Sequence, residues 1–329
     1  MLTTTTDNAP ATTDAPLSAE LVTRIGRALE ASASSNTRRA YRSDWAHFAG
    51  WCEAEGRCAL PAAAETVAGY LVALEADGFA VSTIRRRVAT ISKAHGSQAP
   101  DAANPTRSAL VAGVLRGIGN TRAEGQGKGA APILPAHVRA MVEGAPGEGV
   151  KAKRDRALAL VLLASALRRS ELVALTVADL DWSDPRGVVL AVRRSKTDQT
   201  GQGREVSITR GRDAATCPVR ALRGYLEAAG IKAGPVFRGV DRHSNVSDRG
   251  MTGAGVAYAV KRAAEAAGMD PSQVSPHGFR AGHVSARRAA GEDAATVMDT
   301  TGHTTVRMVR RYDRAARRFR ADVSGALGL

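Results

Sequence analysis

Four polar residues in the last fifth of the chain have side chains suited to phosphate chemistry. His277 and Arg280 lie one helical turn apart, so they share a face of any helix that spans them. An arginine can bind two phosphate oxygens through its planar guanidinium group, and a histidine can donate a hydrogen bond or transfer a proton. His303 follows a glycine, and Tyr312 comes nine residues later. Each of these patterns alone is common by chance, so their meaning depends on what accompanies them.

Tyr312 is a candidate nucleophile because of its neighbours. A phenol has a pKa of about 10 and attacks poorly unless the transition state is stabilised. Tyr312 stands in the run Arg-Arg-Tyr-Asp-Arg, whose cationic side chains can supply that stabilisation electrostatically. A lone tyrosine in such a run is ordinarily an exposed or half-buried ring.

Two more basic residues lie upstream. Arg168 belongs to the segment 166–172 (ALRRSEL), which is a turn that leads into a new helix. Lys196 lies near the start of a polar loop between two predicted β-strands, residues 188–194 and 204–209. The pattern therefore predicts a lysine on a hairpin loop and an arginine at a helix start, both ahead of the histidine and arginine pair.

In these motifs the chain resembles the tyrosine recombinase (phage integrase) family, of the Cre/Xer-like type, along essentially its whole ordered length. The family's first motif, Gly-Leu-Arg-x-Ser-Glu-Leu, matches residues 166–172, and the remaining motifs follow in the family's order. The resemblance implies that Glu171 supports the site. It implies these catalytic residues: Arg168, Lys196, His277, Arg280, His303 and the nucleophile Tyr312.

The chain departs from the family pattern at three positions. Ala166 replaces the usual glycine, Phe279 a common leucine, and Val309 a threonine found in many relatives. None of these changes removes a reacting group, so we expect them to affect packing. His283 shares a helix face with Arg280, and we interpret it as a supporting or structural residue.

The resemblance implies a transesterification without metal, ATP or any other cofactor. Tyr312 would attack the scissile phosphate, form a 3′-phosphotyrosyl bond and free a 5′-hydroxyl. Arg168 and Arg280 would bind the non-bridging oxygens, and His303 would donate a further hydrogen bond. Lys196 would protonate the leaving 5′-oxygen, and His277 would accept or position a proton.

The composition supports a polyanionic partner. The 329 residues include 46 Lys and Arg against 32 Asp and Glu, which gives a net charge of +14 and a pI near 10.5. Nucleic acid is the first choice and an anionic membrane the second. No apolar run approaches the roughly 18 residues of a spanning helix. The start of the chain lacks the features of a secretory signal.

Three cysteines without metal-type spacing indicate a reducing, cytoplasmic setting and no structural zinc.

The chain is predicted to be mainly α with a small antiparallel β-sheet. Residues 1–16 read as a disordered N-terminus, and residues 17–120 as a helical unit. The family resemblance implies that this unit is a SAM-like core-binding domain. The Gly-rich segment 121–133 reads as a linker. Residues 134–329 form the predicted α+β catalytic domain, and their last part, 319–329, is either a docking tail or a frayed end.

One helix of the N-terminal domain is predicted to contact DNA. It begins near residues 82–83, and Arg85, Arg86 and Arg87 follow one another without an intervening acidic residue. Such a run is usually a solvated face, but it also fits phosphate contact. An earlier helix carries aromatic residues at three- and four-residue steps, which we interpret as core packing.

Three other readings have less support. A metal-dependent nuclease needs clustered carboxylates, and the densest acidic group, Asp179, Asp181 and Asp184, reads as a solvated turn. A type IB topoisomerase shares the chemistry but relaxes DNA alone, and a non-catalytic basic DNA-binding protein leaves the ordered motifs unexplained. The family resemblance further implies a double-stranded DNA site and a homotetramer in the synaptic complex. The sequence leaves open the DNA site, the need for accessory proteins and the choice among integration, excision and resolution.

Overall fold

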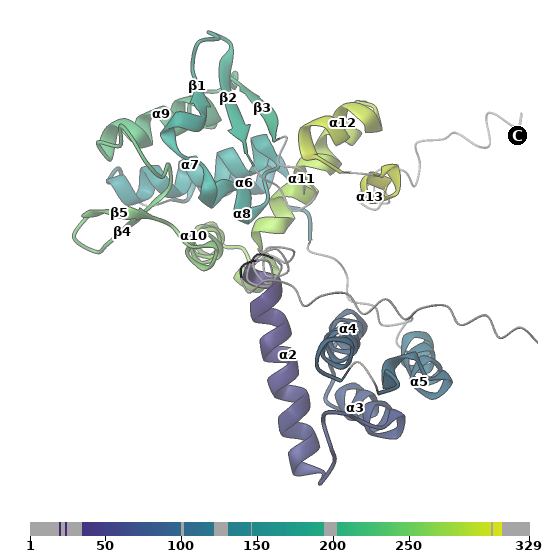
Figure 1. Cartoon of the computed structure of the whole chain (residues 1–329). Coiled ribbons are helices and arrows are strands. Elements are labelled where there is room, and N and C mark those ends of the chain that lie inside the picture. Colours follow the sequence, from purple (N-terminus) through teal and green to yellow (C-terminus); the bar gives the residue numbers. More distant parts are fainter. Residues whose placement is uncertain are drawn as a thin grey trace, which may run out of the picture. The chain divides into compact units, whose positions relative to one another are not determined.

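The computed structural model describes residues 20, 24, 35–99, 102–121, 131–145, 147–193, 203–303 and 305–310. The chain divides into two compact units, residues 1–127 and 128–329 (Figure 1). The predicted disordered N-terminus, most of the predicted linker and the tail 319–329 lie outside the described residues. None of the helices in the described part has the length and apolarity needed to cross a bilayer.

The first unit consists of helices around one apolar core. They are α2 (Ser35–Ala54), α3 (Ala64–Ala76), α4 (Val81–Gln98) and α5 (Ala109–Thr121), with a short 3-10 turn, η1 (Pro105–Arg107), before α5. Residues three or four apart face inward on each helix, as the periodicity predicts. Phe48 of α2, Leu71 of α3 and Ile84 of α4 are wholly buried in this core. The aromatic face of α2 is therefore used for packing.

The second unit is built around α7 (Val150–Ser165). This helix is apolar on most sides, and Leu158, Val161 and Leu162 are fully buried, as expected for a helix covered all round. It packs against neighbouring helices and strand β3 (Figure 1). The other helices of this unit are α6 (Pro135–Glu143), α8 (Arg169–Ala174), α9 (Pro218–Ala228), α10 (Gly253–Ala266), α11 (Pro276–Ala289), α12 (Ala294–Thr301) and α13 (Val306–Arg310).

A small antiparallel sheet lies beside α7 and has the order β1-β2-β3. Its strands are β1 (Leu180–Asp181), β2 (Gly187–Val192) and β3 (Arg204–Thr209). In β3, Val206 and Ile208 face the core, while Glu205, Ser207 and Thr209 alternate with them and are exposed. Val192 pairs with Arg204, so this pair ends the ladder at the predicted lysine loop. A second hairpin joins β4 (Arg238–Val240) and β5 (Val246–Gly250). The predicted fold class, mainly α with a small antiparallel sheet, is confirmed.

Candidate active site

Arg168 is fixed at the turn where α7 ends and α8 begins. Helix α7 stops at Ala166, whose backbone is left-handed (φ +51°). Arg168 is the N-cap of α8, and its backbone N–H donates to Oε2 of Glu171 at 2.9 Å. Its Nη1 donates to Oε1 of the same carboxylate at 2.6 Å. The Glu171 side chain is only 1% exposed, so a buried carboxylate fixes both the backbone and the guanidinium of Arg168.

Arg280 joins this turn to a distant part of the chain. Helix α11 starts at its cap, Ser275, whose hydroxyl accepts from the backbone of Gly278. Arg280 follows within the first two turns and is only 2% exposed. Its Nη1 donates to the carbonyl of Ala166 at 2.7 Å, and its Nη2 donates to the carbonyl of Thr301. One guanidinium thus holds the Arg168 turn against the end of α12.

His303 follows directly after that end. Helix α12 stops at Gly302, whose left-handed backbone (φ +64°) turns the chain sharply. The hydroxyl of Thr301 donates to the Val297 carbonyl at 2.7 Å. The hydroxyl therefore accepts from Nδ1–H of His303, 2.7 Å away. In the neutral ring this leaves Nε2 as an acceptor.

The electrostatic surroundings of His303 show which groups are gathered here. Burial lowers its pKa to about 4, and repulsion from Arg280, Arg168, His277 and Arg204 acts in the same direction. The ring is neutral at pH 7 because burial disfavours its cationic form and the charges around it are already positive. A phosphate bound there would raise the pKa of His303 again, and the protonated ring could then donate from Nε2 as well.

The two other histidines of α11 differ in their exposure. His277 is the second residue of the helix and is exposed. It nevertheless lies close enough to His303 to contribute to the lowering of the His303 pKa. His283 is buried, and its Nδ1 donates to the carbonyl of Leu163 at 2.8 Å. Burial lowers the pKa of His283 to about 4. This setting suits the supporting role predicted for His283.

Two predicted catalytic residues, Lys196 and Tyr312, lie outside the described residues, so their roles stay predictions. Helix α13 ends at Arg310, two positions before Tyr312 in the sequence. Val309 of this helix is fully buried and packs with Val284 of α11 and Val297 of α12. The departure at Val309 thus lies in a small apolar contact that holds α13 to the site.

Sequence reasoning missed Arg204, which lies in the middle of this arrangement. Its Nη2 donates to Oε2 of Glu171 at 2.9 Å, and its Nη1 donates to the carbonyl of Thr300 at 2.6 Å. A signal was present. Arg204 shares a strand face with Val206 and Ile208, and an arginine on the apolar face of a strand needs a polar partner.

The three consecutive arginines of α4 do not share one environment. Arg85 and Arg86 are exposed, but Arg87 is buried on the same face as Ile84 and Ile91. Its guanidinium stacks on the ring of Phe79, with Cζ 4.2 Å from the ring centroid. The expectation that all three arginines form one exposed face is wrong for Arg87. Three successive helical positions span about 200° of the helix circumference, so one of them must turn inward.

The acidic group of the first β-strand region makes local contacts. Asp179 accepts from the backbone and hydroxyl of Thr176 at 2.9 and 2.7 Å and pairs with Arg193 at 2.5 Å. Asp181 and Asp184 each accept a hydrogen bond from the backbone N–H two residues further along the chain. The prediction of a solvated turn is wrong for Asp179, which is buried. Within the described ranges, no group of three or more His, Cys, Asp or Glu is arranged to hold a metal ion.

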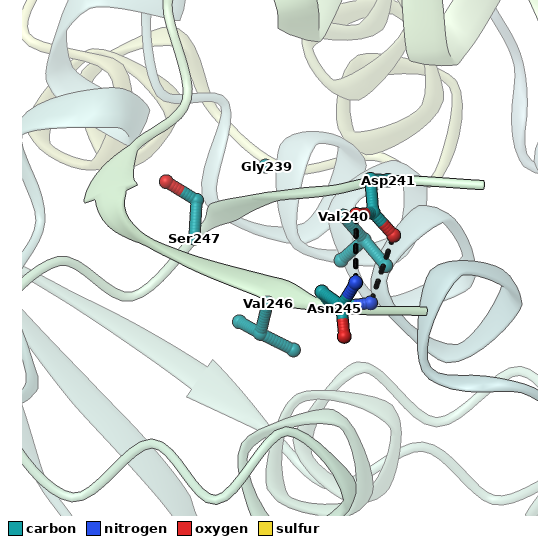
Figure 2. Close-up of a pocket in the computed structure, with 6 residues that line it drawn as sticks. All are labelled: Gly239, Val240, Asp241, Asn245, Val246 and Ser247. Carbon is teal, nitrogen blue, oxygen red and sulfur yellow. Dashed lines mark hydrogen bonds between the residues drawn. The ribbon is translucent and has the colours of Figure 1, made fainter. Parts of the chain in front are cut away.

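Two surface hollows lie apart from these residues. One is an open depression along the β4–β5 hairpin, where the Asn245 side chain donates to Asp241 at 2.9 Å (Figure 2). The other lies between α7 and α10, beside Asp155 and Arg262. Neither is lined by a predicted site residue.

Comparison with known proteins agrees with this geometry. Residues 135–318 match the phage integrase family, and residues 28–95 match the phage integrase N-terminal SAM-like domain. An integrase/recombinase described as a XerD homologue, from Selenomonas ruminantium, is 34% identical over 287 residues, which cover 87% of this chain and 83% of that protein.

Solved structures show the same fold. The Tn1549 transposon integrase in complex with transposon right end DNA has a TM-score of 0.63 at 17% identity and covers 89% of this chain and 92% of that chain. The XerH site-specific recombinase bound to a palindromic difH substrate has a TM-score of 0.59 at 14% identity and covers 81% of this chain and 72% of that chain. The chain belongs to the phage integrase family of tyrosine site-specific recombinases.

Proposed function

We propose that this recombinase cuts and rejoins DNA through a covalent bond to Tyr312. The phenolic oxygen attacks the scissile phosphorus, the bond from phosphorus to the 5′-oxygen breaks, and that oxygen leaves as a hydroxyl. The 5′-hydroxyl of another strand then attacks the phosphotyrosine and releases Tyr312. The convergence of Arg168, Arg280 and His303 on one place carries this proposal, because these are the groups that a phosphate in transfer requires.

The roles of the residues follow from their chemistry. Arg168 and Arg280 bind the two non-bridging oxygens and offset the charge that develops on them. His303 adds a hydrogen bond from Nε2 once the phosphate has raised its pKa. Lys196 protonates the leaving 5′-oxygen, because an alkoxide is a poor leaving group. His277 accepts or positions the proton of Tyr312. No metal or ATP is required, since the phosphotyrosine bond conserves the energy of the broken phosphodiester.

The protein acts on DNA, and its arrangement on DNA is part of the proposal. The substrate is a specific double-stranded recombination site, and four protomers assemble on two sites during strand exchange. Arg85 and Arg86 contact the duplex, and the tail 319–329 docks on a neighbouring protomer. The reaction takes place in the bacterial cytoplasm, at the nucleoid. The relatives are bacterial and phage recombinases, which supports this setting.

The test is formation of a covalent adduct with EDTA present. Duplexes selected from a random library by binding to the Tyr312→Phe protein provide the substrate. Wild type should form a protein–DNA adduct that survives denaturant, and Tyr312→Phe should form none. Tyr258→Phe is the matched control, because Tyr258 is an exposed tyrosine of the same unit, and it should react like wild type.

Three outcomes would contradict the proposal. If EDTA abolished the adduct, the reaction would require a metal. If the Tyr312→Phe protein still cleaved DNA, the nucleophile would be another group. Relaxation of a plasmid without joining of two sites would contradict recombination and favour a topoisomerase activity.

A further inference from the structure

Arg204 is the first residue of β3 and lies mostly inside the catalytic unit. Its side chain is 16% exposed. Its two terminal nitrogens bond to different elements, Glu171 of α8 and the backbone of Thr300 in the last turn of α12. Burial lowers its pKa, and the neighbouring Glu171 carboxylate partly offsets this effect. Arg204 therefore connects three segments that are far apart in the sequence.

The contact with Glu171 affects Arg168 directly. Oε1 of Glu171 accepts from Nη1 of Arg168, while Oε2 accepts from both the backbone of Arg168 and Nη2 of Arg204. The carboxylate is thus held from two sides. Without Arg204, Oε2 would lose its only hydrogen bond from a charged donor among the described residues and would keep the one from the backbone of Arg168. The carboxylate would then no longer set a single position for the Arg168 guanidinium.

The contact with Thr300 affects the other half of the site. Thr301, the next residue, accepts from Arg280 through its carbonyl and from His303 through its hydroxyl. Arg280 links residues 166 and 301, and Arg204 links residues 171 and 300. The two arginines thus make neighbouring sets of hydrogen bonds between the same two segments, residues 166–171 and residues 300–301. The distance between Arg168 and His303 depends on both of them.

Gly302 lets Arg204 reach this position. A Cβ atom at Gly302 would lie 3.2 Å from Nε of Arg204 and 3.5 Å from its Cδ. The left-handed backbone of Gly302 also disfavours a side chain there. The Nε atom of Arg204 is buried against this glycine and has no hydrogen-bond partner among the described residues. Arg204 is thus fitted against the residue that precedes His303.

We propose that Arg204 is a positioning residue of the recombinase, which holds Arg168 and His303 at the spacing that the transferring phosphate requires. It acts through Glu171 and Thr300 and does not itself touch the phosphate. The inference rests on the proposed function, because it assigns Arg204 to the phosphate clamp described there. Loss of Arg204 should therefore slow the chemical step and leave DNA binding almost unchanged.

The test compares single-turnover adduct formation at saturating duplex. Arg204→Gln should react about 30- to 100-fold more slowly than wild type, the range expected when a preorganised charge is misplaced. Its Kd for duplex should stay within about 3-fold of wild type, since the guanidinium faces the interior. Arg204→Lys should recover part of the rate, because an ammonium group can pair with Glu171 but cannot make both bonds with the geometry of a guanidinium.

A matched control separates positioning from general stability. Arg262 of α10 also bonds to a buried carboxylate, Asp155, but that carboxylate pairs with Arg154 and with no predicted site residue. Arg262→Gln should react within about 3-fold of wild type, as a stability change does not alter the rate of molecules that remain folded. A double-mutant cycle with Arg168→Lys adds a second readout. After Arg168→Lys, the further change Arg204→Gln should cost less than about 5-fold, because residues that act through each other are not additive.

Each remaining outcome overturns the inference. A wild-type rate for Arg204→Gln would show that the spacing does not depend on Arg204. Additive losses in the cycle would show that Arg204 does not act through Arg168, and an equal loss in Arg262→Gln would assign the effect to stability. If Arg204→Gln fails to fold, a wild-type rate for Arg204→Lys overturns the inference in the same way. The proposed function fails by a different result, cleavage by the Tyr312→Phe protein.

Discussion

Each unit of this recombinase contains a nearly buried carboxylate that holds two arginines, but the two carboxylates serve different purposes. Asp44 in the first unit is 3% exposed and accepts from Nε and Nη2 of Arg86 at 2.7 and 2.8 Å. Nε of Arg87 lies 3.6 Å from the same carboxylate. In the second unit, Glu171 takes the place of Asp44, and Arg168 and Arg204 take the places of the two arginines.

The two networks differ in which elements carry their arginines and in what those arginines contact. Arg86 and Arg87 are adjacent on α4, so Asp44 joins only α2 to α4. Arg87 continues inward to the hydroxyl of Tyr70 at 3.2 Å, while Arg86 remains 47% exposed. The arginines of Glu171 come from separate segments and continue to other elements of the site. The same ion-pair chemistry therefore stabilises a helix pair in one unit and sets the spacing of a reaction site in the other.

The largest effect expected from this comparison is that of Glu171→Ala. The change leaves Arg168 and Arg204 without their shared carboxylate, so the clamp loses its preorganisation. We expect adduct formation to fall by about 10²- to 10³-fold, the loss typical of an electrostatic group at a reacting centre. Single-turnover kinetics at saturating DNA measure this change. Glu171→Gln, which keeps the shape and two polar atoms, should lose less, and an equal loss would mean that the negative charge of Glu171 alone matters.

Asp44→Ala should affect stability rather than catalysis. It leaves Arg87 buried without its carboxylate, and breaking a buried ion pair from one side costs about 3 kcal/mol of unfolding free energy. Denaturant unfolding followed by tryptophan fluorescence reports mainly on this unit, because Trp45 and Trp51 lie in it. The adduct rate of the folded protein should stay within about 3-fold of wild type.

Asp77→Ala is the control for this prediction. Asp77 is an exposed carboxylate at the end of α3, and its removal should change the unfolding free energy by less than about 0.5 kcal/mol. If Asp44→Ala slowed the reaction of folded protein as strongly as Glu171→Ala, the distinction between the two networks would be wrong.

The unfolding free energy of the two units should also depend differently on acidic pH. The pKa of His283 is lowered by burial from 6.5 to about 4, so the unfolded chain takes up a proton more readily than the folded unit. His283 therefore stabilises the fold fully above pH 6.5, and this contribution is lost as the pH falls from 6.5 toward 4. Between pH 7 and pH 5 the loss should be about 1–2 kcal/mol. Hydrogen exchange of α11 amides measures it.

His283→Asn tests that assignment. The asparagine amide can still donate to the Leu163 carbonyl but does not titrate, so the fall in α11 stability should be smaller than in wild type. His303, whose pKa is also near 4, should account for a remaining slope. In the first unit the pKa of His47 is lowered by partial burial and by the nearby Arg87, but this residue is largely exposed. An equal slope for wild type and His283→Asn would exclude His283 as its source.

The sequence predicted elements well where one periodicity dominated. The strands 188–194 and 204–209 were found at Gly187–Val192 and Arg204–Thr209, because apolar side chains line their buried faces. The helix predicted to begin near residues 82–83 is α4, Val81–Gln98. The domain limits stay predictions, and so do the roles of Lys196 and Tyr312, which lie outside the described residues.

Long-range contacts were the part that the sequence could not supply. The motif Ala166–Leu172 indicated Arg168 and Glu171, but their pairing with Arg204 depends on the hairpin register, in which Val192 meets Arg204. Similarly, a motif match identified Arg280, but not the two carbonyls that it bonds to, 114 and 21 residues away. The prediction for the α4 arginines was wrong for a local reason. The run was treated as one face of the helix, although its three positions span about 200° of the helix circumference.

The smallest effects should come from the arginines that remain exposed on α4. Removal of Arg85 should weaken duplex binding by about 3- to 10-fold at fixed salt and lower the slope of log Kd against log salt by about one. Arg86→Ala should have a smaller effect, since Asp44 already neutralises much of its charge and holds two of its donors. Neither change should alter the adduct rate at saturating DNA, because both act on association alone. Titrations of labelled duplex at several salt concentrations measure the slopes.

Arg57, an exposed arginine on the loop after α2, is the matched control for net charge. If Arg57→Ala weakened binding as much as Arg85→Ala, the contribution of α4 would be one of overall charge and not of contact. If Arg86→Ala had the larger effect, the ion pair with Asp44 would orient the guanidinium toward DNA, and the Asp44 network would then resemble that of Glu171 in function.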